Sequence, residues 1–129
     1  MKFGYTIVYV PDVLASVTFF EKAFGLKRRF VHASGYGEMD TGATALAFAT
    51  HALGASNLPG GYVKASQSAE PLGMEIALVT DNVAAAHVKA ISEGAVSVKE
   101  PQVKPWGQTV SYVRCPDGTL VELCSPVAA

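Results

Sequence analysis

The residues with the most reactive side chains, two cysteines and three histidines, do not form a catalytic arrangement in the sequence. Cys115 and Cys124 lie in strand-like segments, where cysteine usually acts as a small apolar residue, and no histidine is near either of them. They also flank the turn at residues 116–118 asymmetrically, so a hairpin centred there does not place them opposite each other. We therefore expect neither a thiol nucleophile nor a disulfide.

The histidines are widely spaced, and their predicted positions differ. His32 falls in a predicted strand, and His87 falls on a predicted helix, where we expect it to face solvent or to be structural. His51 follows a predicted strand and is the histidine with a route to the rim of a cleft.

Aromatic residues are candidates for contact with a flat organic ligand. The set consists of Tyr5, Tyr9, Phe48, Trp106 and Tyr112. Aromatic walls with a few polar groups suit such a ligand, although aromatic residues in strands are also ordinary core. Trp106 lies between Pro105 and Gly107 in a predicted loop, so it is the least core-like and the first choice for a ligand contact.

The predicted strands and helices that position these residues occur in the same order in both halves of the chain. Apolar residues at both odd and even positions predict a strand at 3–10 that is covered on both faces. The spacing of Val17, Phe20 and Phe24 predicts a helix at 13–24 that Asp12 caps. Three more strands are predicted at 26–32, 36–40 and 44–50. The second half is predicted to contain a strand at 74–79, a helix ending at Gly94, and strands at 95–99, 109–114 and 119–124.

The second helix is predicted to turn an apolar stripe toward its sheet. Asp81 or Asn82 is expected to cap it, and the stripe consists of Val83 or Ala84 with Val88 and Ile91.

This repeat predicts the architecture. Residues 10–12 align with residues 79–81. Residues 44–48 align with residues 119–123, and a glycine turn precedes both of these segments. We expect an α+β fold in which two tandem βαβββ modules pair into one curved mixed sheet. The helices would lie on the convex side and a cleft on the concave side.

The expected domain organisation is one domain of two modules over residues 1–129. The first module spans 1–50 and the second spans 73–129. Between them, 51–72 is rich in glycine, proline and serine, and is expected to be a linker that could include one helical turn.

Composition limits the classes of partner. Only 16% of the 129 residues are charged, 50% are hydrophobic, and the net charge is −1. A nucleic-acid binder usually carries a basic face, and a membrane span needs about 18 apolar residues in a row. We therefore expect a soluble, cytoplasmic protein that binds neither nucleic acid nor a membrane. The shortage of charge favours a homodimer that buries part of its surface.

Two motifs carry a resemblance to a known family. Residues 5–26, YTIVYVPDVLASVTFFEKAFGL, and residues 116–123, PDGTLVEL, resemble the opening and closing motifs of the vicinal oxygen chelate superfamily. Its members include glyoxalase I, bleomycin-resistance proteins, fosfomycin-resistance enzymes and extradiol dioxygenases. The resemblance covers essentially the whole chain and implies the doubled βαβββ fold.

The resemblance also implies where a metal site would lie. In metal-dependent members four strand residues, typically histidine and glutamate, bind one divalent metal. Those positions fall here on Tyr5, Ala47, Glu75 and Glu122. Ala47 has no donor atom and Tyr5 stands where the family usually has histidine, so the set lacks the imidazoles that favour Zn, Fe or Ni. We therefore expect no metal cofactor, with one divalent metal as the alternative.

The two carboxylates are the remaining candidates for chemistry. Glu122 lies between two apolar strand residues, so alternation sends it to the opposite face. Glu75 reaches the family position only if the second half is one residue shorter than the first, and otherwise Met74 faces inward.

A shared, water-poor cleft would raise the pKa of at least one of these two carboxyl groups and supply an acid or base near neutral pH. The alternative is that sheet register splits the pair, or that Arg114 or a lysine neutralises it.

Three functional hypotheses follow. The first is a metal-free protein that binds a small organic molecule, similar to bleomycin-resistance proteins, through Tyr5, Phe48, Glu75, Trp106 and Glu122. The second is a metal-dependent lyase or isomerase similar to glyoxalase I, with Glu122 as general base. The third is a structural or regulatory dimer with a vestigial cleft.

Overall fold

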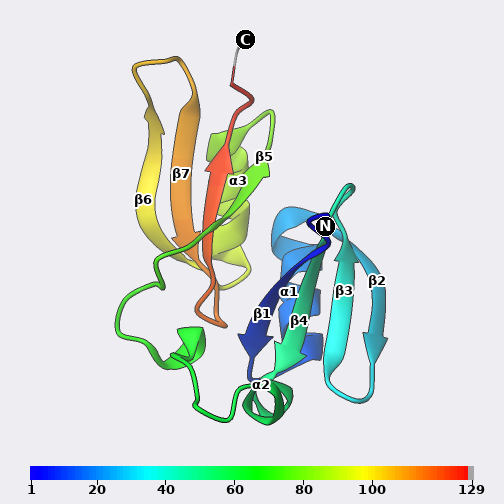
Figure 1. Ribbon diagram of the computed structural model, residues 1–129. Helices are drawn as coiled ribbons and strands as arrows, with labels where there is room; N and C mark the ends of the chain where they lie inside the picture. The colour runs from blue at the N-terminus through cyan, green and yellow to red at the C-terminus, as the bar shows by residue number, and fades with distance from the viewer. Residues whose placement is uncertain (128–129) are drawn as a thin grey trace. The chain divides into compact units, whose positions relative to one another are not determined.

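The computed structural model describes residues 1–127, which form two compact units that divide between Ser68 and Ala69 (Figure 1). The first unit contains β1 (Tyr5–Val10), α1 (Val13–Phe24), β2 (Lys27–His32), β3 (Tyr36–Asp40), β4 (Ala45–Thr50), α2 (His51–Asn57) and the short 3-10 helix η1 (Ala65–Gln67). Its sheet has the order β1-β4-β3-β2, with β1 parallel to β4 and the other pairs antiparallel.

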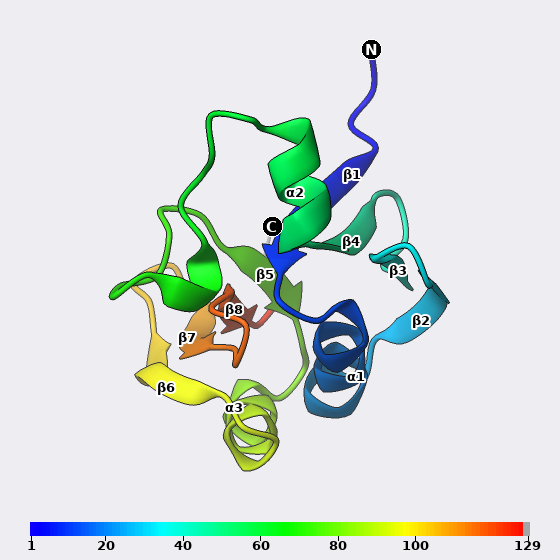
Figure 2. The same ribbon diagram turned by 90° about the horizontal axis from the view of Figure 1, so that it is seen from below.

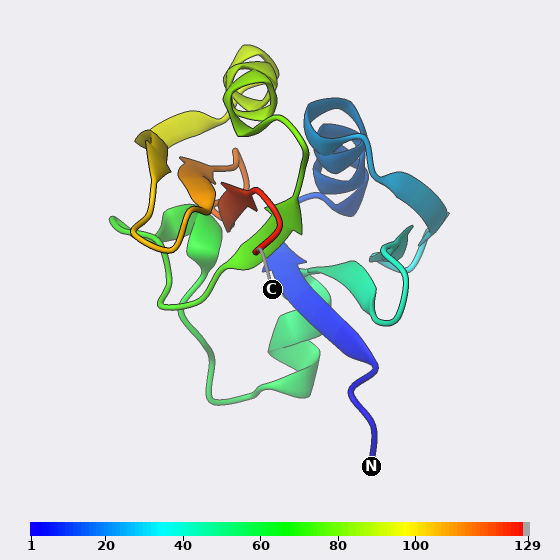
Figure 3. The ribbon, with the colours of Figure 1, turned by 90° about the horizontal axis from the view of Figure 1, so that it is seen from above.

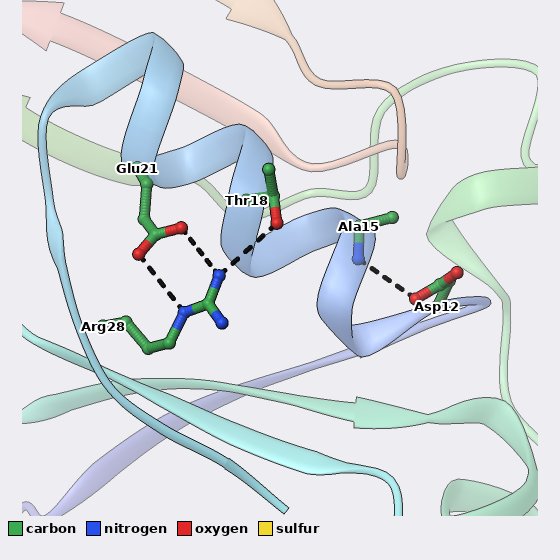
Figure 4. Close-up of polar contacts among 5 residues, drawn as sticks. All are labelled: Asp12, Ala15, Thr18, Glu21 and Arg28. Atoms are coloured by element: carbon green, nitrogen blue, oxygen red, sulfur yellow. Dashed lines mark hydrogen bonds and ion pairs between the residues drawn. The ribbon is translucent and has the colours of Figure 1, made fainter. Parts of the chain in front are cut away.

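Helix α1 is defined at both ends by local chemistry. The Asp12 side chain accepts a hydrogen bond from the Ala15 N–H at 3.0 Å, and Gly25 ends the helix in the left-handed conformation at φ 69° (Figure 4). Phe20 is fully buried and packs against Phe48 of β4, with ring centroids 5.0 Å apart. The predicted helix and its Asp12 cap are confirmed.

The outer end of α1 is tied to β2 by an ion pair. Arg28 donates to both carboxylate oxygens of Glu21, at 2.8 and 3.2 Å, and lies 3.5 Å from the Thr18 hydroxyl (Figure 4). This side of the β2 strand therefore faces the helix.

The second unit repeats the βαβββ order. It contains β5 (Ile76–Val79), α3 (Val83–Ser92), β6 (Val96–Val103), β7 (Thr109–Arg114) and β8 (Leu120–Cys124). Its sheet has the order β5-β8-β7-β6, with β5 parallel to β8. Figures 2 and 3 show the long helix of each unit end-on, to one side of its own sheet.

The doubled α+β architecture is thus confirmed, with a four-stranded mixed sheet in each unit. The pairing of the two sheets into one curved sheet around a cleft stays a prediction. The segment expected to be a linker contains α2 and η1, and most of it belongs to the first unit.

The buried face of α3 corrects the predicted one. Val83, His87 and Ala90 are buried, whereas Val88 is 68% exposed and Ile91 is 38% exposed. His87 replaces an apolar residue because both of its ring nitrogens have partners, the Ser111 and Ser97 hydroxyls, each at 2.9 Å. Its predicted structural role is consistent with this position. Asn82, not Asp81, caps the helix through the Ala85 N–H.

Both cysteines are buried and free, so the predicted absence of a disulfide is confirmed. Across residues 1–127, the structure has no helix whose length and apolar character would allow it to cross a membrane.

Candidate functional site

Strands β7 and β8 place a phenol and a carboxylate side by side on the face of the second sheet opposite α3. The strand register pairs Tyr112 with Glu122 and pairs Glu122 with Ala77 of β5. The Tyr112 hydroxyl donates to Glu122 Oε1 at 2.9 Å. The adjoining positions Val121 and Leu123 are buried toward α3, so alternation along β8 turns Glu122 to the open face, as the sequence predicted.

Glu75 completes this cluster from the residue before β5. It forms a hydrogen bond with Glu122, and its pKa is raised by desolvation, by that hydrogen bond and by the neighbouring charge. Glu75 therefore keeps its proton to a higher pH than an isolated glutamate does. Both Glu75 and Met74, the alternative at this position, are exposed.

The same environment keeps the neighbouring groups protonated. The hydrogen bond to Glu122, followed by desolvation, raises the pKa of Tyr112 to about 12. Desolvation and Glu122 also raise the pKa of the Cys124 thiol. The cluster thus offers hydrogen-bond donors and acceptors and an exchangeable proton rather than an activated nucleophile.

The first unit carries a related pair that the sequence analysis missed. Glu38 of β3 lies directly across from Ala47 of β4, and its side chain is only 9% exposed. It accepts a hydrogen bond from the Tyr36 hydroxyl at 2.7 Å and one from Arg29 Nη1 at 3.2 Å. Burial and the contact with Glu38 raise the pKa of Tyr36. The signal in the sequence was the two-residue spacing of Tyr36 and Glu38, which places both on one strand face.

Three of the five aromatic candidates occupy different environments. Tyr5 begins β1, is 59% exposed and lines a hollow in the first unit. Trp106 lies in the turn between β6 and β7, is 60% exposed, and donates its indole N–H to the Gln108 side chain at 2.9 Å. Phe48 is fully buried and packs against Phe20 on the helix-covered face of its sheet, away from the open face where a ligand contact was expected.

His51 forms hydrogen bonds within the segment that follows β4, and through Tyr62 this segment contacts β1. Its Nδ1 lies 2.8 Å from the Tyr62 hydroxyl and its Nε2 lies 3.2 Å from the Ser66 hydroxyl. The Tyr62 ring in turn packs on Tyr9, with centroids 4.9 Å apart. Desolvation, with a smaller effect of Lys64, lowers the pKa of His51, so the ring is neutral at pH 7.

The donor set does not fit a bound divalent metal. Within residues 1–127 no group of three or more histidine, cysteine, aspartate or glutamate side chains is arranged to hold a metal ion. Ala47 offers no donor atom, and the raised pKa of Glu75 favours its protonated form. A metal would have to displace that proton and would find no imidazole beside it.

A doubled βαβββ chain with a glutamate on the last strand of the second unit defines a class of two-module α+β proteins, and comparison with known proteins identifies the family. Residues 2–123 match the model of the Glyoxalase/Bleomycin resistance protein/Dioxygenase superfamily. The chain belongs to this superfamily, which confirms the resemblance seen in the sequence.

Individual relatives agree with this assignment. The chain is 32% identical over 124 residues to the uncharacterized protein YwbC of Bacillus subtilis, covering 94% of each protein. It is similar to the structure of a glyoxalase-related enzyme from Fulvimarina pelagi, with TM-score 0.82, 19% identity, and 98% and 88% of the two chains covered. A glyoxalase/bleomycin resistance protein/dioxygenase family enzyme from Burkholderia phytofirmans PsJN gives a TM-score of 0.80 at 18% identity, covering 97% and 98%. These two structures share the fold.

Proposed function

We propose that this protein binds a small organic molecule without a metal, using Glu75, Glu122 and Tyr112 on the open face of the second sheet. The observation that carries the proposal is the cluster on the open face, in which the Tyr112 hydroxyl donates to Glu122 at 2.9 Å, while desolvation and the neighbouring Glu122 raise the pKa of Glu75. A protonated Glu75 beside the Glu122 carboxylate presents one donor and several acceptor positions.

The chemistry of these groups selects the kind of ligand. A protonated carboxyl donates to a carbonyl or hydroxyl oxygen, and the Glu122 carboxylate, already paired with Tyr112, accepts from an N–H or O–H. A net charge of −1 gives little steering of a cation. A neutral ligand with a carbonyl, amide or hydroxyl group therefore suits the cluster best.

The experiment is a ligand-observed NMR screen of neutral aromatic amides and phenols against the EDTA-treated protein. For compounds that bind, the NMR signal that reports binding should be mostly lost with Glu122→Gln and kept with the control Glu93→Gln. In the unmodified protein the Glu93 carboxylate pairs with Lys89 on the surface of the same unit. Binding that appears only after a metal is added, or that survives Glu122→Gln unchanged, would overturn the proposal.

The metal-dependent alternative has its own test. In a lyase or isomerase of the glyoxalase I type, Glu122 would act as general base beside a metal that Glu75 helps to bind. Elemental analysis, with thermal shift in Ni, Zn, Mn and Fe(II), should detect no stoichiometric metal and no shift. A shift that Glu122→Gln abolishes would favour the enzyme instead.

We also propose that the protein is a cytoplasmic homodimer. The low content of charged residues, 16%, supports a dimer that buries part of the surface of each protomer. Light scattering after size exclusion should give twice the chain mass, whereas a monomer at micromolar concentration would contradict this part of the proposal.

A further inference from the structure

A polar hollow of about 250 Å³ lies at one end of the first unit. Its walls come from the start of the chain, from β2 and from the turn between β3 and β4. The lining residues that matter for recognition are Lys2, Phe3, Tyr5, Arg29 and Asp40. None of them belongs to the Glu75–Glu122 cluster.

Arg29 is held in the wall of this hollow by a buried acid. Its Nη1 donates to Glu38 Oε1 at 3.2 Å, and Glu38 is fixed on its other oxygen by the Tyr36 hydroxyl at 2.7 Å. The Glu38 side chain is 9% exposed, whereas that of Arg29 is 56% exposed. Within residues 1–127, Glu38 is the partner of the Arg29 guanidinium, and its other N–H donors remain available.

Burying a carboxylate is costly unless it is paired, and an ion pair of this kind adds little stability by itself. It does restrain the position of the guanidinium through Nη1, and a restrained side chain loses less entropy when it binds an oxyanion. Arginine recognises carboxylates through two parallel N–H···O bonds, so the free edge of Arg29 is suited to a carboxylate in the hollow.

The other walls define the rest of the ligand. Lys2 makes no ion pair within the described residues and adds a second positive charge, while Asp40 is the acidic residue of the lining. Phe3 is 70% exposed and Tyr5 is 59% exposed, so both rings present area to a bound molecule. Aromatic rings beside a charged anchor suit a flat ligand with one anionic end.

We propose that this hollow is a binding site for a small aromatic carboxylate, with Arg29 as its anchor and Glu38 and Tyr36 as positioning residues. This proposal rests on residues of the first unit, whereas the proposed function rests on residues of the second unit, so each is tested with its own variants.

The test is an NMR titration of the ¹⁵N-labelled protein with sodium benzoate at constant ionic strength, with benzamide as the neutral analogue. Benzoate should produce saturable shifts in the amides of Gly4 and residues 39–45, and benzamide should not. Arg29→Met should weaken benzoate binding at least tenfold. The matched control is Arg28→Met, which removes the neighbouring arginine that faces α1 and binds Glu21, and it should change affinity less than twofold (Figure 4).

Arg29→Met removes the ion-pair partner of Glu38 and could prevent folding. Two further variants keep the test decisive in that case. Arg29→Lys keeps the charge but loses the fork, and should weaken benzoate binding several-fold with the fold intact. Asp40→Asn removes a repulsive charge and should tighten binding. Equal shifts with benzoate and benzamide, unchanged affinity in Arg29→Lys, or shifts confined to the second unit would each overturn the proposal.

Discussion

Glu38 on β3 lies directly across from Ala47 on β4, which is the strand relationship that Tyr112 on β7 has to Glu122 on β8. Both units therefore carry a glutamate that accepts a tyrosine hydroxyl on the sheet face opposite the long helix. The acid lies on the third strand of the first unit, β3, and on the fourth strand of the second unit, β8. In the first unit Arg29 forms an ion pair with the acid, and in the second unit desolvation and the acid raise the pKa of the neighbouring Glu75.

The phenol of Tyr112 reports the charge on Glu122. Glu122→Gln removes that charge and its strong acceptor, so the pKa of Tyr112 should fall from about 12 toward the usual tyrosine range. Titration of ¹³C-labelled tyrosine rings by NMR measures this directly, and Glu93→Gln should leave it unchanged. A Tyr112 pKa that is the same in both variants would show that Glu122 does not hold the phenol.

The buried position of Phe48 predicts a large effect on stability. Phe48→Ala should lower the free energy of unfolding by about 3–5 kcal/mol, because it removes the ring that packs against Phe20. Trp106→Ala, at a 60% exposed position, should change it by less than about 1 kcal/mol. Urea denaturation measures both. Comparable losses in the two variants would mean that Phe48 is not a core residue.

The hydroxyl of Ser111 holds the buried ring of His87. Ser111→Ala leaves the Nδ1 of His87 without a partner and should cost about 1–3 kcal/mol of unfolding free energy. Ser92→Ala is the matched control, since that hydroxyl donates to a backbone carbonyl on the exposed side of the same helix. A cost for Ser111→Ala no greater than that for the control would place His87 outside the core.

His51 should make stability depend on pH below about 6.5, the usual histidine pKa in an unfolded chain. Because the folded-state pKa of His51 is lowered, the unfolded chain binds a proton first as the pH falls, and the free energy of unfolding decreases. His51→Gln should make this dependence shallower. Urea midpoints at pH 5 and 7.5 test it, and an equal slope in both proteins would show that His51 is not held neutral.

The parts of the fold that local chemistry defines were predictable from the sequence. Asp12 and Gly25 bound α1 at both ends, and Glu122 lies between two buried apolar residues of its strand, Val121 and Leu123. The face of a strand on which each side chain lies was harder to predict. Phe48 was assigned to the open face because every residue from Ala45 to Ala49 is apolar, so the pattern along β4 does not distinguish its two sides.

The polar residues were the least predictable part of the site. His87 was missed as a core residue because a scan for apolar spacing passes over a buried ring whose nitrogens both have partners. Glu38 was missed because its partner Arg29 sits at an irregularity in the pairing of β2 with β3, between Arg28 and Phe30, and strand bulges leave little trace in a sequence.

The raised pKa of Glu75 beside Glu122 is the central feature of this account, and a ¹³C NMR titration of the glutamate carboxyl groups tests it most directly. The account predicts that Glu75 takes up a proton at a pH above the usual glutamate range. In Glu122→Gln, the titration of Glu75 should move back toward that range. If Glu75 titrates like an isolated glutamate in the unmodified protein, Glu122 does not influence its carboxyl group, and the proposed binding cluster is contradicted.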